Sequence, residues 1–233
     1  AYATHLHQYI SRGMEAFLSA LDITGSPHQQ RVITIATTPA MGALLMPGLA
    51  SALKPTFPQI LLHNIAIVDA ARQLDQRQVD LLIDTHLHSG QAISHHVLYQ
   101  DRVQMYCRAG HPALDGPQDE TILAEYEFAL LLPEGQRYPT LHRRLQEEMG
   151  ERRCGFSTFN LMTQAAMIAG SDMLGLTTER LFAMVSRLWP LQTLDFPSLG
   201  EEQIDVALHF NKLSGKEPLL KEIIETVIRS FKA

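Results

Sequence analysis

The sequence predicts an α/β fold built from two small lobes. β-rich runs alternate with helical runs in two sets along the 233 residues, and a long extended segment joins the two sets. Hydrophobic residues make up 45% of the chain and charged residues 19%, a composition that supports an apolar core and excludes a disordered chain. Only two cysteines are present, which excludes a disulfide scaffold. The longest apolar stretch is broken by glycine and proline, so no membrane span is predicted.

The first expected element is an amphipathic helix over residues 4–22. Its apolar positions repeat at steps of three and four, the spacing of a coiled-coil seam, and a Gly-Ser-Pro cluster at 25–27 ends it. Such a helix packs against a partner copy, an upstream domain or its own globule. The seam residues are Leu6, Ile10, Gly13, Phe17 and Ala20.

The next elements form a β-α-β-α-β unit. Thr38 is the expected N-cap of its first helix and Pro39 the first helical residue, because proline is tolerated where the N–H has no partner. Strands joined by helical crossovers are parallel, and their connections are right-handed. The expected strands are 32–37, 59–65 and 79–83, and the expected helices are 38–54 and 69–75.

Residues 96–107 are expected to be extended and to lead into a second α/β set. Breakers at Gly110, Pro112, Gly116 and Pro117 mark a crossing between lobes. The sequence therefore predicts a helical segment over 1–26, a first lobe over 27–107 plus 208–233, and a second lobe over 108–207. The expected strands are 128–132, 154–158, 173–177, 191–196 and 204–210, and the expected helices are 140–149, 160–169, 178–188 and 217–231.

Three runs resemble the LysR-type transcriptional regulators. Residues 74–83, LDQRQVDLLI, are similar to the family run L-x-x-G-x-L-D-L-x-I. Residues 106–114, YCRAGHPAL, resemble the family's HPL crossing, and residues 165–176, AAMIAGSDMLGL, resemble V-x-A-G-x-G-I-A-L-L-P. The helix over 4–22 resembles the family's dimerising linker helix. The order and spacing of these runs span essentially the whole chain, and the pattern is most similar to the branch that includes the LeuO and NodD regulators.

The resemblance implies a fold and a function. The fold is two Rossmann-like lobes of the type 2 periplasmic-binding-protein kind, joined by two crossover strands. The function is effector sensing in a cytoplasmic bacterial transcription regulator, without enzymatic activity or a cofactor. The implied partners are a small-molecule effector, other copies of the chain in a dimer or tetramer, and DNA through an N-terminal winged helix-turn-helix outside these residues. We expect the chain, which starts at Ala1, to be part of a longer protein.

The net charge agrees with the expectation that DNA is bound outside these residues. The formal net charge is −6, from 19 basic and 25 acidic residues, and a DNA-binding surface is built mainly from Lys and Arg. Self-association is expected to use the helix that begins at Pro39, as in the family. The residues expected to supply its apolar surface are Met41, Leu44, Leu45 and Met46.

Three positions depart from the family pattern. Arg77 stands where the family has glycine, so a helix C-cap has to form without the residue that adopts the left-handed conformation most easily. Asp172 replaces another glycine, and Thr177 stands where proline is common. All three lie in or beside loops, so the predicted fold is unchanged.

The candidate ligand-binding residues follow strand ends. Ligands of parallel α/β sheets bind beyond the carboxyl ends of the strands, where helix N-termini offer free N–H groups. In the first lobe the candidates are Thr37, Thr38, Pro39, Ile67, Thr85 and His86, and in the second lobe they are Pro133, Gln136, Arg137, Thr158 and Phe159. Hydroxyl, imidazole and apolar groups together suit a small organic acid. Alternatively, Thr38, Thr158 or Asn160 only caps a helix, and Arg137 is only a solvated residue.

A metal site, a redox pair and an enzyme active site are less well supported by the sequence. Histidines 86, 88, 95 and 96 have no helical i,i+4 pair and no cysteine partner, so a polar loop and not a metal site is expected. Cys107 and Cys154 are interpreted as buried thiols, not a redox pair. Nucleophile-elbow, zinc-protease and phosphate-loop motifs are missing. The main alternative is a free-standing solute-binding protein, and a third is a small enzyme on the same fold; the seam helix favours the regulator.

Overall fold

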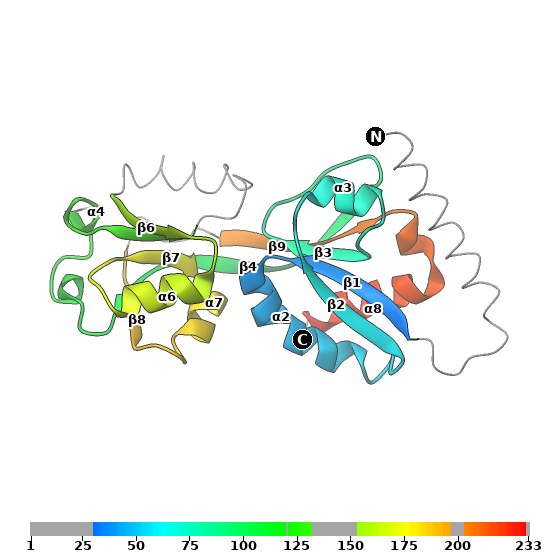
Figure 1. The fold of residues 1–233 in the computed structure, drawn as a ribbon, viewed down its shortest axis with the longest axis horizontal. Coiled ribbons are helices and arrows are strands. Elements are labelled where there is room, and N and C mark those ends of the chain that lie inside the picture. Colours follow the sequence, from blue (N-terminus) through cyan, green and yellow to red (C-terminus); the bar gives the residue numbers. More distant parts are fainter. Residues whose placement is uncertain (1–29, 120, 132–152, 197–202, 232–233) are drawn as a thin grey trace.

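Two long strands join two lobes in the computed structural model (Figure 1). The structure describes residues 30–119, 121–131, 153–196 and 203–231. The joining strands are β4 (Ile93–Arg108) and β9 (Gln203–Asn211), which pair antiparallel. The expected helices over 4–22 and 140–149 lie outside the described residues.

The first lobe, lobe I, is a five-stranded layer in the order β2-β1-β3-β9-β4. Strand β1 (Arg31–Thr37) pairs parallel with β2 (Ile60–Ala66) on one side and with β3 (Leu81–Asp84) on the other. This confirms the predicted β-α-β-α-β unit. Strand β9 then adds antiparallel to β3, so the chain returns to lobe I near its end.

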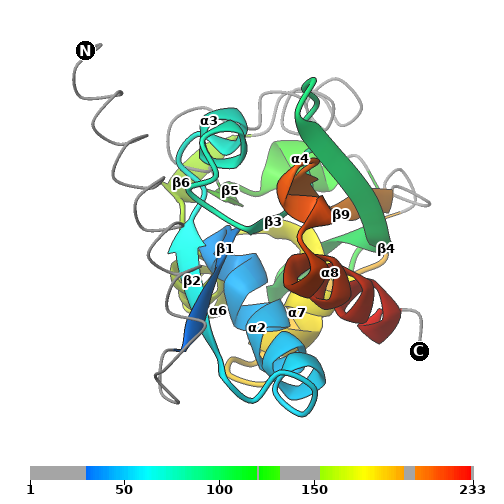
Figure 2. The ribbon, with the colours of Figure 1, turned by 90° about the vertical axis from the view of Figure 1, so that its right-hand side faces the viewer.

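Both faces of this sheet are covered by helices, and the side chains of β1 alternate between them. Ile33 and Ile35 face helices α2 and α8, whereas Ala36 faces α3 on the other side. Figure 2 shows α2 and α8 on one face of the lobe and α3 on the opposite face. A sheet buried on both faces explains the near-continuous apolar runs of β1 and β3. The helices are α2 (Pro39–Leu53), α3 (Ala70–Asp75) and α8 (Pro218–Ser230).

Local sequence signals set the ends of these helices. The Thr38 hydroxyl accepts a hydrogen bond from the Met41 amide at 3.3 Å, which confirms Thr38 as the N-cap of α2. Asp69 caps α3 in the same way through the Arg72 amide. After α3, Arg77 has a φ of +51°, so an arginine occupies the left-handed conformation that favours glycine.

The second lobe, lobe II, begins where β4 exchanges partners. Residues up to Arg102 pair with β9, and residues from Val103 pair with β7 and then β8. A second, two-stranded sheet consists of β5 and β6. The strands are β5 (Phe128–Leu131), β6 (Cys154–Thr158), β7 (Gly175–Thr178) and β8 (Leu191–Leu194). The helices are α4 (Thr121–Glu125), α6 (Leu161–Ala169) and α7 (Glu179–Val185), and short 3-10 turns occupy η2 (Pro112–Leu114) and η4 (Ser214–Lys216).

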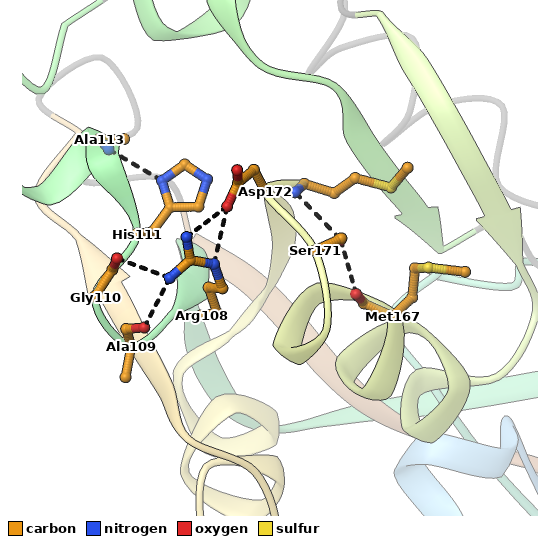
Figure 3. A network of polar contacts seen from close by, with 9 residues as sticks. Arg108, Ala109, Gly110, His111, Ala113, Met167, Ser171 and Asp172 are labelled. Carbon is orange, nitrogen blue, oxygen red and sulfur yellow. Dashed lines mark hydrogen bonds and ion pairs between the residues drawn. The ribbon is translucent and has the colours of Figure 1, made fainter.

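Arg108, the last residue of β4, is hydrogen-bonded to Asp172 in the segment between α6 and β7 (Figure 3). Arg108 donates two hydrogen bonds to Asp172, at 2.6 and 2.9 Å, and one to the Gly110 carbonyl at 2.7 Å. Asp172 is a position where the sequence departs from the family's glycine, and its carboxylate supplies the partner of Arg108. The buried His111 then caps η2 by accepting from the Ala113 amide.

One apolar cluster extends across both lobes. Leu161 and Ala165 of α6 and Leu181 of α7 belong to the same cluster as Met41 and Leu45 of α2. Helices α2 and α6 are in contact, so the lobes meet through helices as well as through β4 and β9.

Candidate functional site

The carboxyl ends of the three parallel strands of lobe I lie side by side. Thr37 is in register with Ala66 of β2 and with Ile83 of β3. The residues that follow these ends therefore share one edge of the sheet. We call this group the strand-end site; it comprises Thr38, Pro39, Ile67, Thr85 and His86.

The first turn of α2 forms one side of this site. Met41 donates to the Thr38 hydroxyl, and Gly42 donates to the Thr38 carbonyl at 2.9 Å. Pro39 has no N–H, so the Ala40 amide is the first-turn donor of α2 without a partner among the described residues. The positive end of the helix dipole adds to this donor.

Thr37 is placed differently from its neighbour Thr38. It is only 2% exposed, and its hydroxyl accepts a hydrogen bond from the Asn64 side-chain amide at 2.9 Å. A Cβ added at Gly42 would come within 2.8 Å of the Thr37 hydroxyl and 2.7 Å of the Asn64 Oδ1. Thr37 is thus packed beneath α2, and the missing side chain of Gly42 makes room for it.

The end of β3 forms the other side of the strand-end site. Asp84 is 1% exposed, and one of its oxygens accepts from the Thr85 amide at 2.7 Å. Thr85 is half-buried and His86 is exposed. Ile67, at the end of β2, is half-buried against the apolar cluster under α3.

Lobe II contributes the start of α6. The Thr158 hydroxyl accepts from the Asn160 amide at 3.2 Å, and Asn160 caps α6 through the amides of Met162 and Thr163. Phe159, between them, is 53% exposed. Leu161 belongs to the apolar cluster that also contains residues of α2, so this turn and α2 share one core. Pro133, Gln136 and Arg137 lie outside the described residues.

Several residues around the site were not among the candidate ligand-binding residues. Asn64 and Gly42 hold Thr37, while Asp84, His88 and His209 form a hydrogen-bonded network behind Thr85. Asp84 carried a usable signal, since it directly follows a buried strand. His209 carried none, because it is 121 residues from His88, its hydrogen-bond partner.

The cysteines correct one expectation. Cys107 is buried, but Cys154 is exposed at the start of β6, so the interpretation of two buried thiols is wrong for Cys154. Cys154 begins β6, in which three of the five residues are exposed. Burial raises the pKa of the Cys107 thiol to about 11, although the neighbouring Arg108 opposes this. Cys107 is therefore protonated at neutral pH and a poor nucleophile.

The structure also corrects the expectation about the apolar surface of α2. Met41 and Leu45 are 4% and 5% exposed and face the chain's own core, so they do not supply the surface predicted for self-association. Helical periodicity explains the difference, because these two positions are four apart and share the inward face. Leu44 and Met46 remain half-buried on its flanks.

Neither a metal site nor a membrane span is found in the part of the chain that the structure describes. No three His, Cys, Asp or Glu side chains there are grouped to hold a metal ion. No helix in these ranges is long and apolar enough to cross a membrane.

A comparison with family models gives one match that spans nearly the whole chain. The model described as the LysR substrate binding domain matches residues 26–232. The chain belongs to this family. It is an effector-binding domain of a LysR-type transcriptional regulator, as the three sequence runs indicated.

Relatives and solved structures agree with this assignment. The chain is 45% identical over 231 residues to the uncharacterized HTH-type transcriptional regulator YbeF of Escherichia coli strain K12, covering 99% of this chain and 73% of YbeF. The probable transcriptional regulator PA0477 of Pseudomonas aeruginosa has a TM-score of 0.78 at 18% identity, covering 97% of this chain and 76% of that one. The reduced OxyR regulatory domain of P. aeruginosa has a TM-score of 0.70 at 18% identity, covering 87% and 98% of the two chains.

These likenesses confirm the predicted fold of two lobes of the type 2 periplasmic-binding-protein kind with two crossover strands. They also favour the regulator over the free-standing solute-binding protein, because the matched relatives are named as transcriptional regulators.

Proposed function

We propose that this LysR effector-binding domain senses a small organic acid bound at the strand-end site, between lobe I and the first turn of α6. The observation that carries the proposal is the set of hydroxyl groups at this edge. The hydroxyls of Thr38 and Thr158 each accept a backbone N–H, so each keeps its own hydrogen to donate. With the Ala40 amide and the dipole of α2, these groups favour a carboxylate.

The other predicted residues have supporting roles. Phe159, at 53% exposed, is available to cover the apolar part of a ligand, and Ile67 and His86 border the same edge. Thr37 is assigned to positioning, because it is buried under α2 and held by Asn64. Pro133, Gln136 and Arg137 are also proposed to contact the ligand; an arginine binds a carboxylate well because its donors match the two oxygens.

Signalling is proposed to work by linkage between ligand binding and the placement of the lobes. The boundary between them is proposed to lie in β4 and β9, near the predicted divisions at 107/108 and 207/208. A ligand that contacts both lobes binds one arrangement more tightly and so shifts the population toward it. In a dimer or tetramer, this shift moves the attached DNA-binding domains. The HTH-type name of YbeF, of which this chain covers 73%, supports a DNA-binding domain elsewhere in the full-length protein.

Several finer assignments belong to the same proposal. Self-association is proposed through the exposed face of α2, bordered by Leu44 and Met46. The protein is proposed to act in the cytoplasm, where the DNA is, and to have no enzymatic activity or cofactor. Within the family, the run over 74–83 and the run over 165–176 support a place near the LeuO and NodD branch.

A thermal-shift screen with a panel of mono- and dicarboxylic acids tests the ligand class. An acid at about 100 times its Kd adds about 2.7 kcal/mol of stability, which raises the Tm by roughly 5–10 °C for a domain of this size. The informative variants are T38D and T38N, because both residues are good N-caps but only Asp adds a negative charge.

We expect T38D to fold and to lose the Tm increase, and T38N to keep part of it. S51D, near the other end of α2, is the control for added charge and should respond like the wild type. The proposal fails if no acid raises the Tm, or if an acid stabilises T38D as much as S51D.

A further inference from the structure

A buried acid anchors the loop that follows β3. One oxygen of Asp84 accepts from the Thr85 amide at 2.7 Å, and the other accepts from His88 Nε2 at 2.8 Å. The His88 side chain is 18% exposed and the Asp84 side chain 1%. The loop from Thr85 to His88 is therefore folded back onto the strand it leaves, and Asp84 holds both of its ends.

The same loop is held from the far end of the chain by His209 of β9. The His88 backbone amide donates to His209 Nε2 at 3.1 Å. His209 is 0% exposed, in register with Leu82 of β3 and with His95 of β4. We call Asp84, His88 and His209 the histidine network.

The hydrogen bond fixes the protonation state that His209 needs. An Nε2 that accepts a hydrogen bond has to be unprotonated, so the neutral ring carries its hydrogen on Nδ1. That Nδ1 is buried and has no hydrogen-bond partner of normal geometry among the described residues. Burial, together with the neighbouring His88 and His95, lowers the pKa of His209 to about 4, although Asp84 and the Leu82 backbone oppose this shift.

Among the described residues, one acid and two histidines interact with His209, and a third histidine lies beside His88. Asp84 is on β3, His88 and His86 are on the loop, and His95 is on β4. The His88 and His209 rings meet edge to face with centroids 5.2 Å apart, and the His86 ring lies 4.8 Å from His88. A proton added to His209 would remove the acceptor for His88 and add a buried positive charge beside these rings.

We propose that His209 is a positioning residue for the strand-end site: its unprotonated Nε2 holds the 85–88 loop, and thereby Thr85 and His86, in the conformation that receives the effector. The ligand-binding role of Thr85 and His86 in this inference rests on the proposed function. The hydrogen bond between His209 and the loop is independent of any ligand. Because β9 is one of the two strands that join the lobes, His209 also links the loop to the crossover.

Amide hydrogen exchange of the segment 85–92 in the purified protein without ligand tests directly whether His209 holds the 85–88 loop. His209→Leu removes the acceptor, and His209→Gln places an oxygen near the position of Nε2 but cannot be protonated at these pH values. His63→Gln changes an exposed histidine of β2 and serves as the control. Rates are measured between pH 7 and pH 4 and corrected for the intrinsic pH dependence of exchange.

We expect exchange of the segment to rise at least 10-fold at pH 7 in His209→Leu and to stay near the wild-type rate in His209→Gln and His63→Gln. Below pH 5 the wild type and His63→Gln should lose protection while His209→Gln keeps it. The proposal is overturned if His209→Leu exchanges within about twofold of the wild type. If His209→Leu does not fold, equal loss of protection in the wild type and His209→Gln on acidification overturns it.

A second arm separates this inference from the proposed function. The affinity for an acid found in the thermal-shift screen should fall in His209→Leu and be restored in His209→Gln. If no acid binds the wild type, the proposed ligand is wrong, whereas the exchange data still decide whether His209 holds the loop. If an acid binds all variants equally although the loop has been released, the positioning role is wrong and the ligand class stands.

Discussion

Each lobe contains a buried polar network attached to a crossover strand, and the two networks compared below differ in chemistry. Lobe I has the histidine network, with two ionisable groups nearly or fully buried, Asp84 and His209. Lobe II has a neutral network, in which the Tyr106 hydroxyl of β4 donates to Gln164 of α6 at 3.0 Å and Gln164 donates to the Ala129 carbonyl at 2.7 Å. We call this second set the glutamine network.

The difference predicts where the molecule responds to pH. Burial raises the pKa of Tyr106, so this hydroxyl stays neutral at any ordinary pH. The glutamine network therefore gives lobe II a fixed set of hydrogen bonds. The histidine network lies behind the strand-end site and loses an acceptor when His209 is protonated. Lobe I thus contains the proposed ligand contacts and the histidine network, which acid disrupts. The glutamine network of lobe II does not change with pH.

The largest effect is expected from breaking the glutamine network. Gln164 is 0% exposed, and Gln164→Leu leaves both the Tyr106 hydroxyl and the Ala129 carbonyl without their partner. Two unpaired buried groups cost about 3 kcal/mol of unfolding free energy. Urea denaturation at pH 7 and pH 5 should give the same loss at both values. Gln192→Leu, at an exposed position of β8, is the control; a loss that grows on acidification would contradict the assignment of pH dependence to lobe I.

The next effect is the pH dependence carried by His209. Its pKa is about 4 in the folded protein and 6.5 in an unfolded chain, so between these values the unfolded state binds more protons. The part of the unfolding free energy that depends on neutral His209 is therefore fully present above pH 6.5 and is lost as the pH drops toward 4. Relative to His209→Gln, the wild type should lose roughly 2 kcal/mol between pH 7 and pH 4.5. Parallel urea titrations of the two proteins measure this, and identical pH profiles would show that His209 does not carry it.

A smaller effect comes from combining two changes in lobe II. Adding Tyr106→Phe to Gln164→Leu removes the hydroxyl that the first change left unpaired. The double variant should recover about 1 kcal/mol relative to Gln164→Leu alone, a non-additivity expected of residues in one network. A double-mutant cycle by urea denaturation detects it. Simple addition of the two losses would mean that the two side chains are not coupled.

The smallest effect, of opposite sign, is expected at Arg77. An arginine at a φ of +51° carries a steric cost of about 1–2 kcal/mol that glycine avoids, although glycine loses more entropy on folding. Arg77→Gly should raise the unfolding free energy by up to about 1 kcal/mol without changing its pH dependence. Arg72→Gly, inside α3, is the contrasting control and should be destabilising. A loss of stability in Arg77→Gly would indicate that the arginine side chain contributes more than its backbone costs.

The elements that sequence predicted best are those set by local signals. Strand 154–158 was predicted with its observed bounds, and Thr38 was predicted as a cap because a cap depends only on the next few residues. The short elements α4, η2 and η4 were missed, since they fall among breakers and have no clear periodicity. The exchange of partners within β4 also cannot be inferred from a uniform run of β-rich residues.

The candidate site was predictable in position but not in detail. The strand-end rule located Thr38, Thr85 and His86 correctly at one edge, because parallel strands end together. It did not separate Thr38 from the buried Thr37, which is held by Asn64 across 27 positions of sequence. Nor did it find His209, whose bond to the loop depends on the return of β9 to lobe I. Long-range pairing of this kind is decided by topology and has no local signature.

Chemical-shift mapping with the acid that raises the Tm most tests the central claim most directly. On titration with that acid, the largest amide shifts should belong to the strand-end site and the start of α6, namely Thr38, Ala40, Ile67, Thr85 and Phe159. Such a pattern would establish this edge as the place where the LysR domain senses its effector. A contradicting result would be shifts confined to the hollow of about 200 Å³ between α2, α7 and α8, lined by Leu44, Arg180 and Phe231, with the strand-end amides unmoved.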